Sequence, residues 1–139
     1  MTLRSAVEQM RHTILSNECT SNVIKIELPL PPPELFPNRA AGKHWAVLYK
    51  HKKAFKETCY LLTKSQVSGK FTGGLMMMTL MYCFPDARSR DVDNCLAASK
   101  SGLDGMAEAI GINDKYLDPI LVYRTYNTEP KLIIHLETL

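Results

Sequence analysis

The chain has 139 residues, of which 45% are hydrophobic and 22% are charged, and its formal net charge is +3. This length and composition predict one globular domain with its own core, and they exclude a disordered chain. No run of about 18 consecutive apolar residues occurs, so we expect neither a membrane-spanning helix nor a membrane partner.

The spacing of the four cysteines also limits the classes of protein to which the chain could belong. Cys19, Cys59, Cys83 and Cys95 are scattered, with no CxxC pair and no close histidine spacing. This pattern predicts reduced, mostly buried thiols and no zinc site. The first 15 residues lack the continuous apolar segment of a secretory signal, so we expect a cytoplasmic location.

Hydrophobic spacing predicts the elements of the first half of the chain. Residues 2–15 have helical spacing, and residues 1–20 are expected to extend a main domain of residues 21–139. Residues 22–28 alternate as a strand does, whereas the prolines of 29–38 predict a stiff extended loop. Residues 44–64 predict a lysine-rich helix whose apolar face comprises Trp45, Leu48, Tyr49, Phe55, Cys59 and Leu62.

The second half is expected to alternate strand and helix. Residues 71–84 are apolar on both faces near their centre, as in a covered central strand. A helix is expected at 94–110, where Gly102 and Gly105 indicate close packing. The remaining predicted segments are loops at 85–90 and 111–118, strands at 119–126 and 131–138, and a turn between those strands. The order α, β, α, β, α, β, β predicts a single α+β domain built on a small mixed sheet.

Charge is unevenly distributed along the chain. Residues 39–70 contain eight basic residues and one acid, a net +7, which leaves −4 for the rest of the chain. Residues 86–118 contain seven acids and four bases. A basic segment beside an acidic cluster suits a polyanion held against a metal-binding pocket, although a solvated lysine-rich helix face would look the same.

The most informative stretch is RSRDVDNCLAASK, residues 88–100, with two acids one residue apart. Asp93 or Asn94 could cap the following helix, which is the purely structural interpretation. The functional interpretation is a Mg²⁺ site, because this ion takes one or two carboxylates together with waters and phosphate oxygens. Asp91 and Asp93 are the candidate ligands, and Asp114 in the later loop is the candidate third acid.

Two further residues of the predicted helix complete this group. Lys100 lies two helical turns after Asp93 and so on the same face, where it could contact a phosphate, although a solvated lysine would fit equally well. Asp104 is four residues after Lys100, which is the spacing of a helical ion pair.

The segment RDVDNCLAASKSGLDGMAEAIGIND resembles the signature of the RusA-type Holliday junction resolvases, which are common in phages and prophages. That family has an acid-x-acid-Asn at a helix start, a lysine in the helix, an LDG or LDA stretch and a loop ending in paired acids. The upstream LPPPELFPNRAAGKHW is similar to the family's proline-rich segment with its asparagine and aromatic residue. The resemblance covers about residues 24–136.

The resemblance implies a RusA-like fold and a homodimer that cuts four-way DNA junctions with Mg²⁺ or Mn²⁺, in a bacterium or phage-infected host cell. It implies that Asp91, Asp93 and Asp114 bind the metal, while Lys100 is expected to assist at the phosphate. DNA contacts are expected from the basic segment, the proline-rich segment and the arginines beside the acids, namely Asn38, Arg39, Lys43, Lys50, Lys53, Lys56, Arg88 and Arg90.

The sequence departs from the family pattern at two positions. The best-known motif has its lysine four residues after the second acid, where this chain has Ala97, and Lys100 matches a spacing associated with phage members. Asn113 stands where the family often has the first of two acids. A non-catalytic junction- or DNA-binding protein therefore remains an alternative. A glycosyltransferase that uses the two acids to bind a metal and a sugar nucleotide is a further one.

Overall fold

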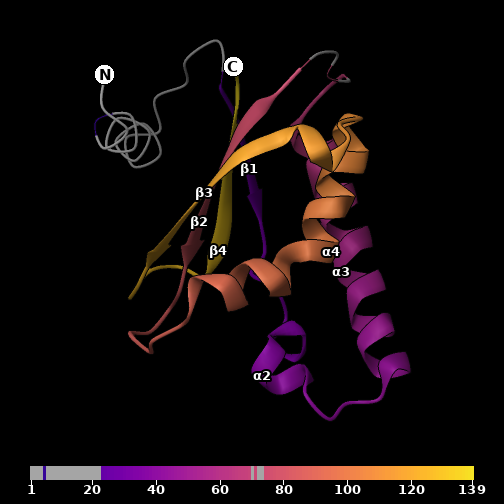
Figure 1. Ribbon diagram of the computed structural model, residues 1–139, viewed down its shortest axis with the longest axis vertical. Coiled ribbons are helices and arrows are strands. Elements are labelled where there is room, and N and C mark those ends of the chain that lie inside the picture. The colour runs from indigo at the N-terminus through magenta and orange to yellow at the C-terminus, as the bar shows by residue number, and fades with distance from the viewer. Residues whose placement is uncertain (1–4, 6–22, 70, 72–73) are drawn as a thin grey trace.

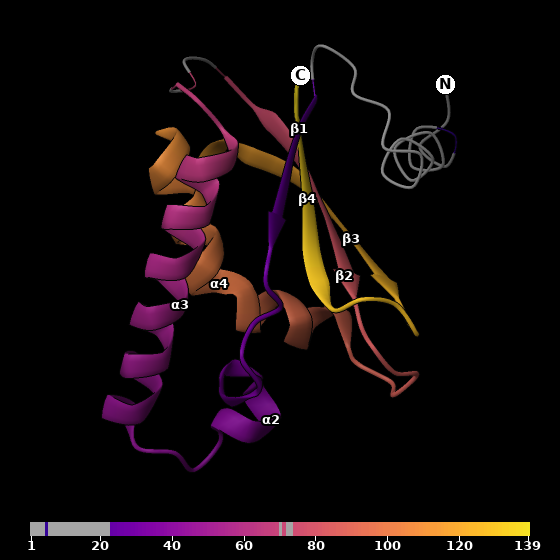
Figure 2. The same cartoon turned by 180° about the vertical axis from the view of Figure 1, so that it is seen from behind.

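The structure, a computed structural model, describes residues 5, 23–69, 71 and 74–139. Its described elements form a four-stranded mixed sheet with two long helices on one face (Figures 1 and 2). The predicted α+β class and mixed sheet are confirmed. The helix predicted at residues 2–15 and the extension 1–20 lie outside the described residues, apart from Ser5.

The sheet contains β1 (Val23–Leu28), β2 (Met76–Cys83), β3 (Leu117–Thr125) and β4 (Lys131–Thr138) in the order β1-β4-β2-β3. β4 is antiparallel to both β1 and β2, whereas β2 and β3 are parallel. β2 is therefore a central strand, and it is buried along almost all of its length, as its apolar sequence predicted. The segment after β3 is not a hairpin turn, because β2 lies between β3 and β4.

Two long helices cover one face of the sheet. α3 (Trp45–Gln66) precedes β2, and α4 (Val92–Ile110) connects β2 to the parallel β3. The α4 side chains Leu103, Met106 and Ala107 are buried. The hydroxyls of Tyr82 on β2 and Ser99 on α4 form a buried hydrogen bond of 2.7 Å. This bond fixes α4 against the central strand in addition to the apolar packing.

The two glycines of α4 allow α3 to approach closely. A Cβ at Gly105 would lie 2.3 Å from the backbone oxygen of Lys56, and one at Gly102 would lie 2.4 Å from the ring of Phe55. No real side chain tolerates such distances without movement of its neighbours. The prediction that these glycines mark close packing is confirmed, and it is α3 that they contact.

The predicted apolar face of α3 is only partly correct. Phe55 and Cys59 are buried, and the burial raises the pKa of the Cys59 thiol to about 12. Trp45, Tyr49 and Leu62 are exposed, and Trp45 retains 72% of its accessible surface. For Trp45 and Tyr49 the reason is geometric, because the first turns of α3 extend beyond the sheet (Figure 1).

The proline-rich segment is not the extended loop that the sequence predicted. It contains a short 3-10 helix, η1 (Pro33–Leu35), and one turn of helix, α2 (Pro37–Ala40). Pro33 and Pro37 are the first residues of these helices, where the missing N–H is not required and the fixed φ angle suits the helix. α2 contacts α4, so the segment folds back toward the start of α4 (Figure 2).

Candidate functional site

The two acids of RSRDVDN lie at the N-terminus of α4, just after the chain leaves the central strand. Asp91 is the N-cap residue with an extended backbone, and Asp93 is in the first turn. Both side chains are exposed, and neither forms a hydrogen bond or ion pair with a described residue. The capping prediction for Asp93 or Asn94 is wrong, because α4 begins earlier, at Val92. Capping therefore explains neither carboxylate, and the positive end of the helix dipole favours their negative charge.

Lys100, in the middle of α4, connects two other acids. Its ammonium lies 2.7 Å from a carboxylate oxygen of Asp104 and 3.1 Å from one of Asp114. The pair with Asp104 confirms the predicted i, i+4 contact. Hydrogen bonds to Asp104 and then Asp114 raise the pKa of Lys100, so the amine stays protonated. Lys100 therefore neutralises part of the negative charge that these carboxylates bring together.

Asp114 begins a short 3-10 helix, η2 (Asp114–Tyr116), inside the segment that was predicted to be a loop. The side chain of Asn113 caps it by accepting a hydrogen bond of 3.1 Å from the backbone N–H of Lys115. β3 begins directly afterwards, at Leu117. Asn113, which stands where the resolvases often have an acid, therefore has a structural role here, because it stabilises the turn that contains Asp114.

The structure brings Asp114 to Lys100 but does not gather the three predicted metal ligands. Within the described residues, no group of three or more His, Cys, Asp or Glu side chains could hold a metal ion. Lys100 is seven residues after Asp93, which corresponds to about 10 Å along a helix. Asp91 and Asp93 alone still fit Mg²⁺, because this ion is commonly held by one or two carboxylates with waters and phosphate oxygens.

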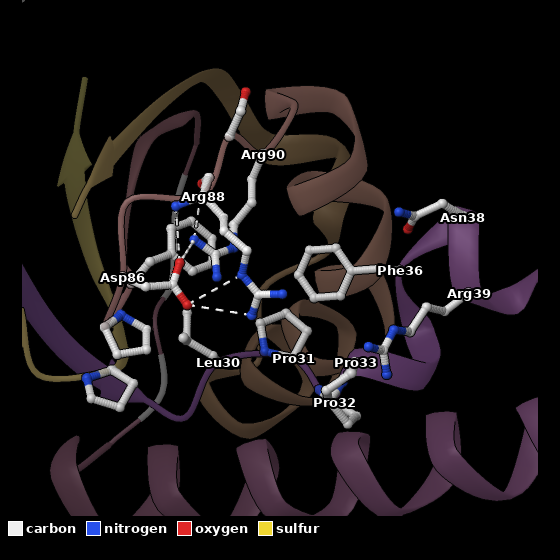
Figure 3. Close-up of a pocket in the computed structure, with 14 residues that line it drawn as sticks. Leu30, Pro31, Pro32, Pro33, Phe36, Asn38, Arg39, Asp86, Arg88 and Arg90 are labelled. Atoms are coloured by element: carbon white, nitrogen blue, oxygen red, sulfur yellow. Dashed lines mark hydrogen bonds and ion pairs between the residues drawn. The ribbon is translucent and has the colours of Figure 1, made fainter. Parts of the chain in front are cut away.

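A pocket of about 500 Å³ lies beside the acids, between the proline-rich segment and the loop after β2 (Figure 3). It includes four of the residues predicted to contact DNA: Asn38, Arg39, Arg88 and Arg90. Arg39 and Asn38 come from α2, whereas the other two come from the loop that leads directly into Asp91. Segments 50 residues apart in the chain are therefore combined in one concave basic surface.

Asp86 organises the arginines of this pocket. Its carboxylate lies 2.9 Å from Arg90 and 3.3 Å from Arg88, and it also accepts a hydrogen bond of 3.0 Å from the Arg88 backbone N–H. The hydrogen bonds from Arg90 and then from the Arg88 backbone lower the pKa of Asp86 to about 2. The carboxylate therefore stays charged at any physiological pH and holds both side chains in place (Figure 3).

The two arginines differ in availability. Arg90 stacks on the ring of Phe84 with 4.1 Å between its guanidinium carbon and the ring centroid, and only 18% of its side chain is exposed. Its backbone oxygen accepts a hydrogen bond from Arg124 on β3. Arg88 is 79% exposed. Arg90 thus fixes the chain just before Asp91, whereas the guanidinium of Arg88, although paired with Asp86, is largely exposed and accessible to a ligand.

The lysines predicted to contact DNA lie on or just before α3, on its solvent side. Lys43, Lys50 and Lys53 are exposed and form no ion pair with a described residue. Lys56 is different, because its ammonium lies 3.1 Å from Glu108 on α4. Lys53 and Lys56 also line a second cavity, of about 670 Å³, between the two helices.

Asp86, Phe84 and Arg124, which together position Arg90, were not predicted from the sequence. The alternation Asp86-x-Arg88-x-Arg90 carried a signal for the first of these, since a loop aspartate often binds the backbone two residues later. The position of Arg124 depends on β2 and β3 being neighbours, which no local pattern reveals.

No protein-family model matches the chain, and no curated protein matches it significantly. The resemblance to the resolvases therefore rests on the quoted residues. Among the residues that the structure describes, no helix is long and apolar enough to cross a membrane.

Proposed function

We propose that the chain is a Mg²⁺-dependent endodeoxyribonuclease that cuts four-way DNA junctions, acting as a homodimer in the cytoplasm of a bacterium or phage-infected cell. One observation carries this proposal. Asp91 and Asp93 are exposed carboxylates without partners among the described residues. They come directly after Arg90, which lines a pocket that gathers arginines from two distant segments of the chain. This arrangement suits a site where an anionic strand meets a hard metal ion.

In this proposal Asp91 and Asp93 hold the metal. A bound Mg²⁺, or Mn²⁺ in its place, would supply a water of lowered pKa and would neutralise charge on the scissile phosphate. Arg39 and Arg88 hold the strand near the acids, while Lys43, Lys50 and Lys53 contact backbone phosphates without reading sequence. Lys100 keeps Asp114 and Asp104 neutralised, and its ammonium is available to a phosphate that approaches α4.

The homodimer part of the proposal follows from the substrate. A four-way junction has two-fold symmetry, and paired cuts require two sites related by the same symmetry. Size-exclusion chromatography with light scattering measures the mass in solution. A strictly monomeric protein that nevertheless cuts both strands symmetrically would contradict the homodimer.

The decisive experiment compares Asp93→Asn with the wild type on synthetic four-way junctions in Mg²⁺ and in Mn²⁺. We expect Asp93→Asn to reduce the cutting rate by roughly 100-fold or more while junction binding survives, since a neutral amide is a poor ligand for a hard cation. Asp118→Asn, which changes an exposed aspartate at the start of β3, is the matched control and should cut as the wild type does. Cutting by Asp93→Asn at the wild-type rate would remove the metal-site assignment.

A non-catalytic junction-binding protein is the second candidate. The observation in its favour is that Asp114 is paired with Lys100 and, among the described residues, does not belong to a group of three acids. Tight junction binding without cutting in either metal would favour this candidate. Equal affinity for junctions and for simple duplex DNA would contradict both candidates.

A further inference from the structure

We infer that the pocket between the proline-rich segment and the loop after β2 binds one unpaired nucleotide of a DNA strand. Its phosphate would lie between Arg39 and Arg88, and its base would lie against the wall formed by Pro31, Pro33 and Phe36. The inference deepens the proposed function, on which it rests for the identity of the polymer. It assigns a binding site for a single base beside the acids, in addition to contacts with the backbone.

The size and the walls of the pocket favour a nucleotide. A volume of about 500 Å³ lies in the ordinary range for sites that enclose a small ligand. One wall is apolar, from prolines and the partly buried Phe36, and a flat base of any sequence can pack on such a wall. A DNA duplex is too wide to enter a pocket of this size, so a base reaches the pocket only after it has left the helical stack.

The charges of the pocket fit the phosphate of the same nucleotide. Arg39 on α2 is exposed and forms no ion pair with a described residue. Arg88 is also exposed, and Asp86 holds its backbone and its side chain, so that little freedom is lost on binding (Figure 3). The lining carries three arginines against one aspartate, a net charge of +2 that complements a phosphodiester.

The position of the pocket places this nucleotide beside the acids. Arg90 lines the pocket and is held by Asp86 and Phe84, and Asp91 is the next residue. A strand with one base in the pocket would therefore pass its backbone close to the start of α4. Unpaired bases are least costly to extrude at a branch point, which links this site to a preference for branched DNA.

The experiment varies the ligand first and therefore does not depend on the folding of a variant. Fluorescence anisotropy compares a short labelled oligothymidylate with an abasic oligomer of the same length and backbone. We expect the wild type to bind the oligothymidylate roughly tenfold more tightly, because one base packs in the pocket. Equal binding of both strands would overturn the inference.

Protein variants then locate the effect. Arg39→Gln and Arg88→Gln should each weaken binding of both strands several-fold, whereas Phe36→Leu should lower only the preference for the strand with bases. Lys64→Gln is the matched loss of one charge, at the far end of α3, and should change affinity less than twofold at physiological salt. If the arginine variants behave as Lys64→Gln does, the pocket is not the binding site.

Junction cutting measured in parallel separates this inference from the proposed function. A wild type that cuts junctions but binds both oligomers equally refutes the pocket assignment and leaves the nuclease proposal intact. A wild type that prefers the strand with bases, with the preference lost in Phe36→Leu, supports the pocket even if no cutting occurs. Thermal unfolding of each variant checks that its fold is intact.

Discussion

The two long helices of this protein differ sharply in how they meet the rest of the molecule. α4 buries ten of its 19 residues, whereas α3 buries only Phe55, Cys59 and Thr63 of its 22. α4 contacts the sheet and α3 and carries the acids at its first turn, and it is called the inner helix because it is the more buried of the two. α3 contacts α4 and β1 and presents lysines to solvent, and it is called the outer helix. The difference indicates a division of labour, in which the inner helix fixes the candidate reactive groups and the outer helix provides a charged surface.

The sequences of the helices explain the difference. The buried part of α4 consists largely of glycine, alanine, serine and other small residues, which allow a helix to approach a sheet on one side and another helix on the other. α3 has large polar side chains on most of its surface and can be covered along only a narrow stripe. Three predictions test how far this contrast extends.

The largest expected effect concerns the contact between the helices. Gly105→Ala should destabilise the protein by about 2 kcal/mol, because the new methyl group would overlap the backbone of Lys56 and force the helices apart. Chemical denaturation measures the change. The matched control is Gly74→Ala, where an added Cβ meets nothing within 4 Å. A Gly105→Ala variant as stable as the wild type would show that α3 is not held tightly on α4.

The next effect concerns Lys100 on the inner helix. Lys100→Gln should change the free energy of unfolding by less than about 1 kcal/mol, because 64% of the side chain is exposed and its ion pairs are screened. Junction cutting should fall by roughly tenfold if the ammonium contacts a phosphate during the reaction. Lys115→Gln removes a neighbouring exposed charge and is the control. Equal cutting rates for the two variants would show that Lys100 forms its ion pairs but does not contact the phosphate.

The smallest effect distinguishes two lysines of the outer helix. The slope of log affinity against log salt concentration is negative, and Lys53→Gln should make it less steep by about one, because one phosphate contact is lost. Lys56→Gln should change it less, since Lys56 is already paired with Glu108 of α4. Salt titration of junction binding measures both slopes. Identical slopes for both variants and the wild type would exclude α3 from the DNA interface.

The parts of the fold that follow a local period could be predicted from the sequence. The alternation in β1 and the covered composition of β2 identified these strands, and the i, i+4 spacing identified the pair of Lys100 with Asp104. The exposed first turns of α3 could not be identified, because an apolar stripe does not tell how far the covering sheet extends. The helical turns at Pro33 and Pro37 were missed because proline was taken only as a residue that interrupts structure.

The sequence singled out residues of the candidate site, but it did not show how the structure groups them. Asp91, Asp93 and Arg88 were singled out from the sequence alone, and so was Arg39. Whether Asp114 joins Asp91 or Lys100 depends on where the chain turns after α4, and that turn is set by the αL conformation of Gly111 and by the Asn113 cap. The arginine network of Asp86 likewise depends on the path of a short loop.

The glycine contacts between α3 and α4 have a consequence for recognition. With the backbones of the two helices so close, the spacing between the lysines of α3 and the acids of α4 is nearly constant, and neither helix can shift to suit a ligand. Under the proposed function, a DNA branch that binds both would have to adapt its own shape, and its affinity would depend on how easily its arms bend. Discrimination among DNA structures would then depend on the flexibility of each DNA, because Gly102 and Gly105 keep the distance between the two binding surfaces fixed.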